Sequence, residues 1–136
     1  MNTTAGTTGA VDPGTIAAAY VAAVGRHDLD AVAELLADDV VARMAAGTST
    51  KQEWLAALRR LLPALQRNEL RHVSADGATA CVVYDFVTDT PAGSVPCVEV
   101  ITVSDGLIHG IELIFDRVSF GPVNQALQER AAVTTV

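Results

Sequence analysis

Basic residues are few in this chain, and they are scattered. Nine lysines and arginines stand against sixteen aspartates and glutamates, which gives a formal net charge of −7. A nucleic-acid-binding surface needs clustered Lys and Arg to neutralise phosphates, so the composition argues against nucleic acid as a partner. The chain also lacks an uncharged apolar run of the roughly 18 residues that a membrane helix needs. We therefore expect no nucleic acid and no membrane as partners.

Cysteines and metal-ligand patterns are equally sparse. Cys81 and Cys97 lie in apolar, strand-like runs without the spacing of a metal site, and free thiols in a reducing cytoplasm are the expected state. No phosphate loop or nucleophile elbow is found in the sequence. We predict no metal and no cofactor. Residues 1–12 lack the basic and apolar segments of a secretory signal, so we expect a disordered tail on a cytoplasmic protein.

The apolar pattern has a period of 3.6 in the first half of the chain and a period of 2 in the second. Capping residues open the helical segments: Asp12-Pro13, Asp28 or Asp30, and Ser49 or Thr50. Four helices are predicted. The first runs from Pro13 to Gly25, and the second begins at Leu29 and ends before Asp38-Asp39. The third runs from Lys51 to Gln66, with a kink or an early end at Pro63, and the fourth runs from Pro122 to Ala132. The predicted strands begin near Val40 and cover residues 70–73, 79–88, 95–103 and 107–118.

Helices followed by antiparallel strands indicate an α+β fold. The chain is long enough for one domain with its own core, and no internal repeat or linker divides it. We assign residues 13–120 to this domain and residues 121–136 to a short C-terminal helix and tail.

Three short motifs give this chain a resemblance to known proteins. Tyr20-Val21-Ala22-Ala23, Asp28-Leu29-Asp30 and Leu36-Ala37-Asp38-Asp39 resemble the opening of the ketosteroid isomerases and of the wider SnoaL-like, NTF2-like superfamily. The match has no gaps over residues 20–39 and is looser over residues 80–115. The resemblance implies a cone, in which a curved antiparallel sheet wraps around a long N-terminal helix with two further helices. The same cone hosts isomerases, polyketide cyclases, epoxide hydrolases, dehydratases and non-catalytic modules.

The resemblance also implies roles for particular residues. In the isomerases a tyrosine and a protonated aspartic acid share an enolate oxygen, while a separate aspartate moves the proton. Tyr20 matches the tyrosine, Glu99 the acidic donor, and Met44 the position of the base. A thioether does not accept a proton at neutral pH, and the neighbouring Arg43 is permanently charged. The steroid isomerisation therefore requires another base in this chain.

Epoxide hydrolases of the limonene-epoxide type match less well. Leu113 stands where that mechanism needs a carboxylate, and Asp85 matches the second aspartate only with Val83 in the place of the arginine. We do not expect this reaction.

Strand alternation indicates which side chains share a face. Val82, Tyr84 and Phe86 lie on one face of their strand. If the following hairpin turns about Ala92, position 84 pairs near position 99, which makes Tyr84 and Glu99 cross-strand neighbours.

On the last strand Ile111, Leu113 and Phe115 form the apolar face. Glu112, Ile114 and Asp116 lie on the other face, which suits a partly wet subunit interface. Since related enzymes commonly dimerise through the outer side of this sheet, we expect a homodimer.

The few aromatic residues point to a hollow interior. Small residues surround Tyr20 on the first helix, and small side chains beside a few large ones leave a cavity. The catalytic candidates are Tyr20, Glu99 and Tyr84. The candidates for substrate binding are Met44, Trp54, Val82, Phe86, Cys97, Ile111, Leu113 and Phe115. In such a cavity burial raises the pKa of Glu99 and suits it to donate a hydrogen bond or to act as a general acid or base.

Ordinary structural explanations stand beside these. Tyr20 is also explained as a core tyrosine, Glu99 as an outward-facing carboxylate and Tyr84 as packing. Cys97, without a paired base, is expected to be inert. Asp38 and Asp39 are read as helix-ending residues that bind backbone amides. All three histidines are expected at the surface; of His72 and His109, the latter is the better cavity candidate, because it shares its face with Ile111.

Two functions remain open. The first is a cofactor-independent enzyme that isomerises, cyclises or dehydrates a hydrophobic, carbonyl-bearing small molecule through an enol or enolate. The second is a non-catalytic module that binds a small hydrophobic ligand or dimerises. An open cavity in which Tyr20 and Glu99 come within hydrogen-bond reach favours the enzyme.

Overall fold

The computed structural model describes residues 12–135, so the prediction of a disordered tail over residues 1–12 falls almost entirely outside the described residues. The described part forms four α-helices, one 3₁₀ turn and six strands. In chain order they are α1 (Pro13–Gly25), α2 (Leu29–Leu35), β1 (Leu36–Met44), β2 (Gly47–Ser49), α3 (Lys51–Leu61), η2 (Leu62–Ala64), β3 (Leu65–Asp76), β4 (Thr79–Thr88), β5 (Ser94–Ser104), β6 (Leu107–Phe115) and α4 (Gly121–Thr135). No helix within these residues is both long and apolar enough to cross a membrane.

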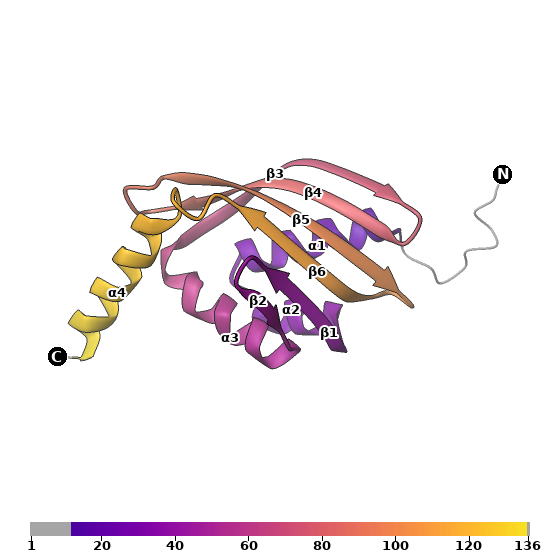
Figure 1. The fold of residues 1–136 in the computed structure, drawn as a ribbon, viewed down its shortest axis with the longest axis horizontal. Helices are drawn as coiled ribbons and strands as arrows, with labels where there is room; N and C mark the ends of the chain where they lie inside the picture. Colours follow the sequence, from indigo (N-terminus) through magenta and orange to yellow (C-terminus); the bar gives the residue numbers. More distant parts are fainter. Residues whose placement is uncertain (1–11, 136) are drawn as a thin grey trace.

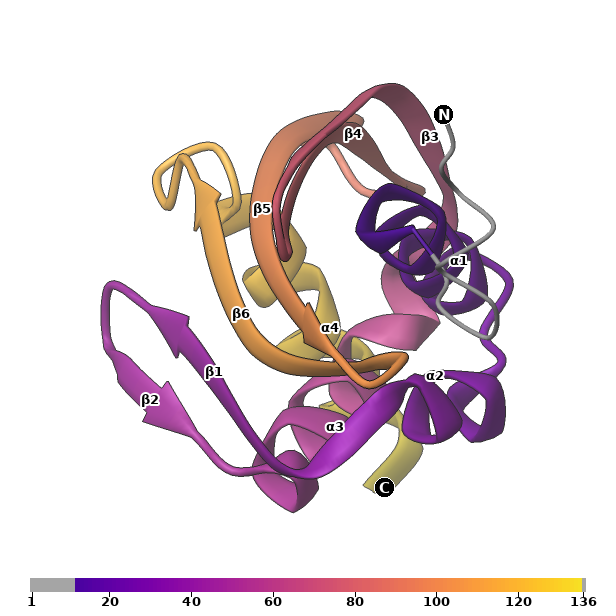
Figure 2. The same cartoon turned by 90° about the vertical axis from the view of Figure 1, so that its right-hand side faces the viewer.

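The strands form one curved sheet in the order β2-β1-β6-β5-β4-β3. The helices α1 and α3 lie on its concave side, as Figures 1 and 2 show. The predicted α+β cone is confirmed, with one correction: the sheet is mixed, because β1 pairs with β6 in parallel. These two strands are not joined by a hairpin but are separated by α3 and four other strands, so the chain can bring them together in the same direction.

Helix α1 forms as its sequence predicts. Asp12 caps it by accepting a hydrogen bond from the backbone N–H of Thr15 at 3.1 Å, and Pro13 occupies the first turn. Ile16, Tyr20, Val21 and Val24 are buried against the sheet, together with small neighbours. Figure 2 shows α1 inside the curve of the sheet, beside β3. The helix thus carries Tyr20 into the middle of the fold.

The third helix is shorter than predicted and β3 is longer. Helix α3 begins with a capping box, in which Thr50 and Glu53 bond each other's backbone N–H groups. It ends at Leu61, and Pro63 lies in the 3₁₀ turn that follows, since proline cannot continue the helical hydrogen bonds. β3 then starts at Leu65. Two register shifts, between Leu65 and Arg67 and between Leu70 and His72, interrupt its alternation, which weakens the pattern of a strand along its length.

Asp38 and Asp39 do not end a helix. Helix α2, capped by Asp28, ends at Leu35, and both aspartates lie on the exposed side of β1. Asp38 accepts a hydrogen bond from Lys51 Nζ at 3.3 Å, and Asp39 lies 3.3 Å from Nδ1 of His109. Two adjacent aspartates usually disfavour a strand, but here each has a basic partner.

The last strand also ends earlier than predicted. β6 stops at Phe115, because the carboxylate of Asp116 accepts hydrogen bonds from the Val118 N–H at 3.0 Å and from Ser119 Oγ at 2.6 Å. These bonds form a turn that competes with a strand. β4 has its predicted bounds, β5 gains one residue at each end, and α4 exceeds the predicted closing helix at both ends.

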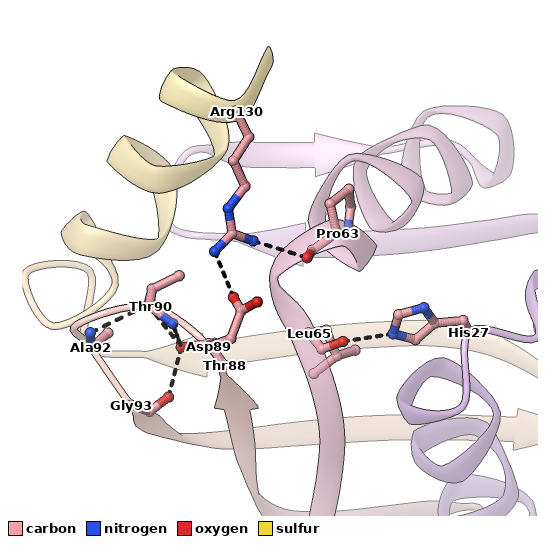
Figure 3. Close-up of polar contacts among 9 residues, drawn as sticks. All are labelled: His27, Pro63, Leu65, Thr88, Asp89, Thr90, Ala92, Gly93 and Arg130. Atoms are coloured by element: carbon pink, nitrogen blue, oxygen red, sulfur yellow. Dashed lines mark hydrogen bonds and ion pairs between the residues drawn. The ribbon is translucent and has the colours of Figure 1, made fainter. Parts of the chain in front are cut away.

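Helix α4 projects from the end of the sheet (Figure 1), and Arg130 bonds it to the neighbouring segments. The guanidinium group of Arg130 donates to the carbonyl O of Pro63 at 3.0 Å and contacts the carboxylate of Asp89 at 2.8 Å (Figure 3). Nearby, the exposed ring of His27 donates from Nε2 to the Leu65 carbonyl at 2.7 Å (Figure 3). His27 is therefore at the surface as predicted, and it also joins the end of α1 to the start of β3.

Candidate functional site

A cavity of about 590 Å³ opens between α1, α3, the concave face of the sheet and the start of α4. Its volume lies within the range of ordinary small-molecule sites. Nine of the predicted site residues line it: Tyr20, Met44, Trp54, Tyr84, Phe86, Cys97, Glu99, Leu113 and Phe115. The four aromatic side chains that alternation and helical spacing placed inside are thus brought together, with Trp54 facing them from α3.

Val82 and Ile111, predicted to bind substrate, do not line the cavity. Both are almost completely buried and belong to the packed core. Alternation correctly places them on the concave face, but α1 packs against β4 and fills the space there. A pattern of period 2 predicts which face of the strand a side chain occupies. It does not predict how far along the strand a cavity extends.

Glu99 is the central polar group of the cavity. Its side chain on β5 is only 3% exposed, and Tyr84 Oη donates a hydrogen bond to Oε2. The other oxygen, Oε1, is buried and has no partner among the described residues. Burial raises the pKa of Glu99 to about 7, against the opposing effect of the Tyr84 hydrogen bond. The carboxyl group is therefore able both to give and to take a proton near neutral pH.

The contact between Tyr84 and Glu99 is diagonal. Tyr84 pairs with Cys97, and Glu99 pairs with Val82, so the predicted pairing of position 84 near position 99 is shifted by two residues. The shift is an even number and leaves both side chains on the same face. Diagonal neighbours remain within reach of a long aromatic side chain, which explains why the interaction is present although the register differs.

Tyr20 is held by the tryptophan of α3. Trp54 Nε1 donates a hydrogen bond to Tyr20 Oη at 2.8 Å. An indole N–H can only donate, so the phenol oxygen is the acceptor and its own proton remains for another group. Burial, and next the charge of Glu99, raise the pKa of Tyr20 well above its ordinary value, whereas the Trp54 hydrogen bond lowers it. The phenol therefore stays neutral and can donate a hydrogen bond into the cavity.

Tyr20 and Glu99 line the same cavity but are not hydrogen-bonded to each other in the described part of the chain. Glu99 is bonded to Tyr84, and Tyr20 to Trp54. The two side chains therefore line one cavity as two separate polar groups. This arrangement differs from a shared pair in which both donate to one oxygen.

Cys97 and Met44 contribute no acid or base. Burial, and next the charge of Glu99, raise the pKa of the Cys97 thiol to about 12, which agrees with the expectation of an inert thiol. Met44, which the resemblance matches to the position of the isomerases' base, lines the cavity. Within residues 12–135 no group of three or more His, Cys, Asp or Glu side chains is placed to hold a metal ion.

His109 does not line the cavity, which agrees with its expected surface position, although it shares the alternation of Ile111. A register shift between Thr102 and Val103 on the neighbouring strand β5 makes Ile108 the buried residue. The ring of His109 instead contacts Asp39. His72 is exposed, as predicted. Asp85 contacts Arg71 at 3.3 Å and does not line the cavity, whereas Leu113 does. The acidic set of an epoxide hydrolase is therefore not assembled here.

Several lining residues were not predicted from the sequence: Asn68, Arg60, Arg117, Phe120 and Asn124. Phe120 packs against Phe86 and Phe115, with ring centroids 5.6 Å and 5.1 Å apart. These residues come from the irregular strand β3, the flank of α3 and the segment after β6, where neither period is clear. In the sequence, the one indication of these residues was Phe120, an aromatic residue just before Gly121-Pro122.

The SnoaL-like domain family matches this chain over residues 17–111. A comparison with curated proteins finds no match. A protein from Kribbella flavida has a similar structure, with a TM-score of 0.75 and 28% identity, and the match covers 85% of this chain and 96% of that one. A candidate polyketide cyclase from Sinorhizobium meliloti has a TM-score of 0.66 and 24% identity, with coverages of 74% and 94%.

A candidate ketosteroid isomerase, also from Kribbella flavida, has a TM-score of 0.67 and 19% identity, with coverages of 76% and 77%. At such identities a structural likeness establishes the fold alone. The family match covers well over half of the chain, and it includes both Tyr20 and Glu99. The chain therefore belongs to the family of SnoaL-like domain proteins, within the NTF2-like fold.

Proposed function

We propose that this protein is a cofactor-independent enzyme that moves a proton within a hydrophobic, carbonyl-bearing small molecule, as isomerases and cyclases do. The observation that supports this most is the state of Glu99. The carboxyl group is buried in an apolar cavity, one oxygen is held by Tyr84, and the other is free to meet a ligand. A carboxyl group with a pKa of about 7 in such a place is poised for proton transfer.

Glu99 takes the role of the base in this proposal. Its Oε1 removes a proton from the carbon next to the carbonyl, and the electron pair of the C–H bond moves onto the carbonyl oxygen to form an enolate. Tyr84 favours this role, because it donates to Oε2 and so stabilises the carboxylate. The base that Met44 does not supply thus comes from β5.

Tyr20 stabilises the enolate oxygen. Its phenol is neutral, buried and in the cavity, and the hydrogen bond from Trp54 polarises it. The enolate then regains a proton from Glu99 at another carbon, which is an isomerisation, or attacks a second carbonyl carbon of the same molecule, which is a cyclisation. Both outcomes share the first step.

A second candidate function is a module that binds a small hydrophobic ligand without chemistry. Met44 favours it, since this residue, which the resemblance matches to the isomerases' base, lines the cavity. The two functions differ in a property that can be measured without the natural substrate: only an enzyme accelerates the removal of a proton from a bound ketone.

The exchange of α-protons of α-tetralone in deuterium oxide, followed by proton NMR, tests the proposal. We expect the wild-type protein to accelerate the exchange and Tyr20→Phe to lower the rate by about 10²–10³-fold, the usual effect of losing one oxyanion donor. Cys81→Ala, which replaces a free cysteine on β4 that does not line the cavity, should retain most of the rate. Thermal melting checks that each variant is folded. A wild-type rate equal to that of buffer at neutral and mildly alkaline pH would favour the binding module.

We also propose that the protein forms a homodimer through the outer face of the sheet. Val83, Val98 and Ile114 are cross-strand partners in one row on this face, and Ile114 is 52% exposed. A contiguous apolar row on a solvent-facing sheet is typical of an interaction surface. Light scattering after gel filtration should give the mass of a dimer for the wild type. Ile114→Arg should give that of a monomer, whereas Gln52→Arg, on the exposed side of α3, should not. A monomeric wild type would disprove this proposal.

A further inference from the structure

Asn68 is a second residue that lines the cavity and carries a buried hydrogen-bond acceptor. It lies on β3 directly opposite Phe86, on the same concave face. Its Nδ2 donates to the backbone carbonyl of Val21 in α1 at 3.0 Å. Since a carbonyl can only accept a hydrogen bond, this contact fixes which end of the amide is nitrogen. The oxygen, Oδ1, is therefore held on the side away from Val21.

The close approach of α1 and β3 positions this amide. A Cβ atom on Gly25 would lie 2.8 Å from the backbone nitrogen of Asn68, a distance that no larger residue tolerates. Glycine at the end of α1 therefore lets β3 come near enough for Asn68 to reach the helix. The orientation of the side chain is set by the backbone of two elements, which makes it a rigid feature of the site.

Oδ1 of Asn68 is buried and has no partner among the described residues. Only one other side-chain atom in the described part of the chain shares this state, and that atom is Oε1 of Glu99. Both residues line the same cavity. Buried acceptors without donors are unfavourable and uncommon, so the donor of a bound ligand can supply the missing partner of each.

The two acceptors are far apart. Asn68 pairs with Phe86, and Glu99 pairs with Val82, so their Cα positions differ by two strands and by four residues along the sheet. With standard strand spacing and rise this is roughly 10 Å across and roughly 13 Å along the sheet. A single group of a ligand cannot meet both oxygens. An elongated ligand with a polar group at each end can.

We propose that Asn68 is a ligand-binding residue, and that it accepts a hydrogen bond from a hydroxyl group at the end of the substrate remote from the reacting carbonyl. This inference rests on the proposed function for the identity of the carbonyl end. The amide is neutral, and the cavity wall carries three arginines beside the carboxyl groups of Glu99 and Glu112, so no excess of negative charge attracts a cation and a neutral donor suffices for the amide oxygen. The substrate class is therefore an elongated, mainly apolar hydroxy ketone.

Three rigid ketones of similar shape test the proposal by isothermal titration calorimetry. They are para-acetylbiphenyl, the same ketone with a hydroxyl at the far para position, and the same ketone with a methoxy group there. We expect the hydroxyl compound to bind the wild-type protein about tenfold more tightly than the parent ketone. The methoxy compound, which cannot donate, should show no such gain.

Two variants separate the subsite from the general shape of the cavity. Asn68→Leu should remove the tenfold preference and leave the affinity for the parent ketone within about threefold. Phe86→Leu, its cross-strand neighbour, should change the affinity for all three ketones and keep the preference. Equal binding of the hydroxyl and methoxy compounds to the wild type, or a preference that survives in Asn68→Leu, would overturn the inference. The wild-type comparison decides even if Asn68→Leu does not fold.

The readout is independent of catalysis. A hydroxyl preference without any proton exchange would leave the Asn68 subsite in place and remove the proposed enzymatic function. Proton exchange without a hydroxyl preference would support the proposed enzymatic function and remove the Asn68 subsite.

Discussion

Replacing Glu99 with glutamine should lower the rate of α-proton exchange by about 10²–10⁴-fold, the usual contribution of a general base. Glutamine has nearly the same size and still accepts the hydrogen bond from Tyr84, but it cannot take a proton. In the wild type the rate should rise with pH and level off above about 7, because the carboxylate is the reactive form and burial raises the pKa of Glu99 to that value. The rate in Glu99→Gln should not show this step. NMR measurement of exchange across this pH range gives both results.

Asp85→Asn is the matched control. This carboxylate lies on the neighbouring strand β4, contacts Arg71 and does not line the cavity, so its removal should leave the rate unchanged within a few-fold. A wild-type rate that falls as pH rises through about 7 would instead identify Glu99 as an acid or as a hydrogen-bond donor. A Glu99→Gln rate close to that of the wild type would exclude it as the proton carrier.

The second large effect concerns stability. The pKa of Glu99 is raised from 4.5 to about 7 in the folded protein, so between these pH values the folded state holds a proton that the unfolded state has lost. The free energy of unfolding therefore falls as pH rises through this window. The loss from this one group is about 3 kcal/mol, complete above the folded-state pKa. This is a large fraction of the stability of an ordinary domain.

Urea denaturation on both sides of the window measures this effect. Glu99→Gln has no titrating group at this position, so its stability should lack the 3 kcal/mol step, by the same estimate of about 1.4 kcal/mol per pKa unit. We therefore expect the variant to be more stable than the wild type at alkaline pH and similar to it at acidic pH. Wild-type and variant curves that run parallel at all pH values would show that Glu99 is not perturbed by burial. A gain in stability where activity is lost is typical of an active-site residue.

Much of this site follows from local patterns in the sequence. The buried stripe of α1 fixes the direction of Tyr20, and the alternation of β4 and β5 places Tyr84 and Glu99 on the same side. Both results depend on periods that hold within one element. The predicted pairing of β4 with β5 differs from the observed one by two residues. Tyr84 and Glu99 are nevertheless in contact, because an even shift changes the cross-strand neighbours but keeps each side chain on the same face.

Other features depend on contacts between distant elements, and no local pattern contains them. Val82 faces inward as predicted but is covered by α1, and His109 faces outward because of an irregularity in the pairing of β5 and β6. Asn68 lies on a strand whose bulges hide its alternation. Its function as a cavity residue depends on how closely Gly25 lets a helix approach, which is a tertiary property.

The parallel pairing of β1 with β6 has a consequence for folding during synthesis. Arg43 of β1 lies opposite Glu112 of β6, so the wall that carries Met44 is completed only by a strand that is synthesised after β2, β3, β4 and β5. On the ribosome, a chain that has emerged only as far as β5 exposes an unpaired edge at β1 and has no closed ligand chamber. Such distant pairings form slowly, because loop closure must precede them. The binding chamber therefore closes only after β6 has emerged and has paired with β1.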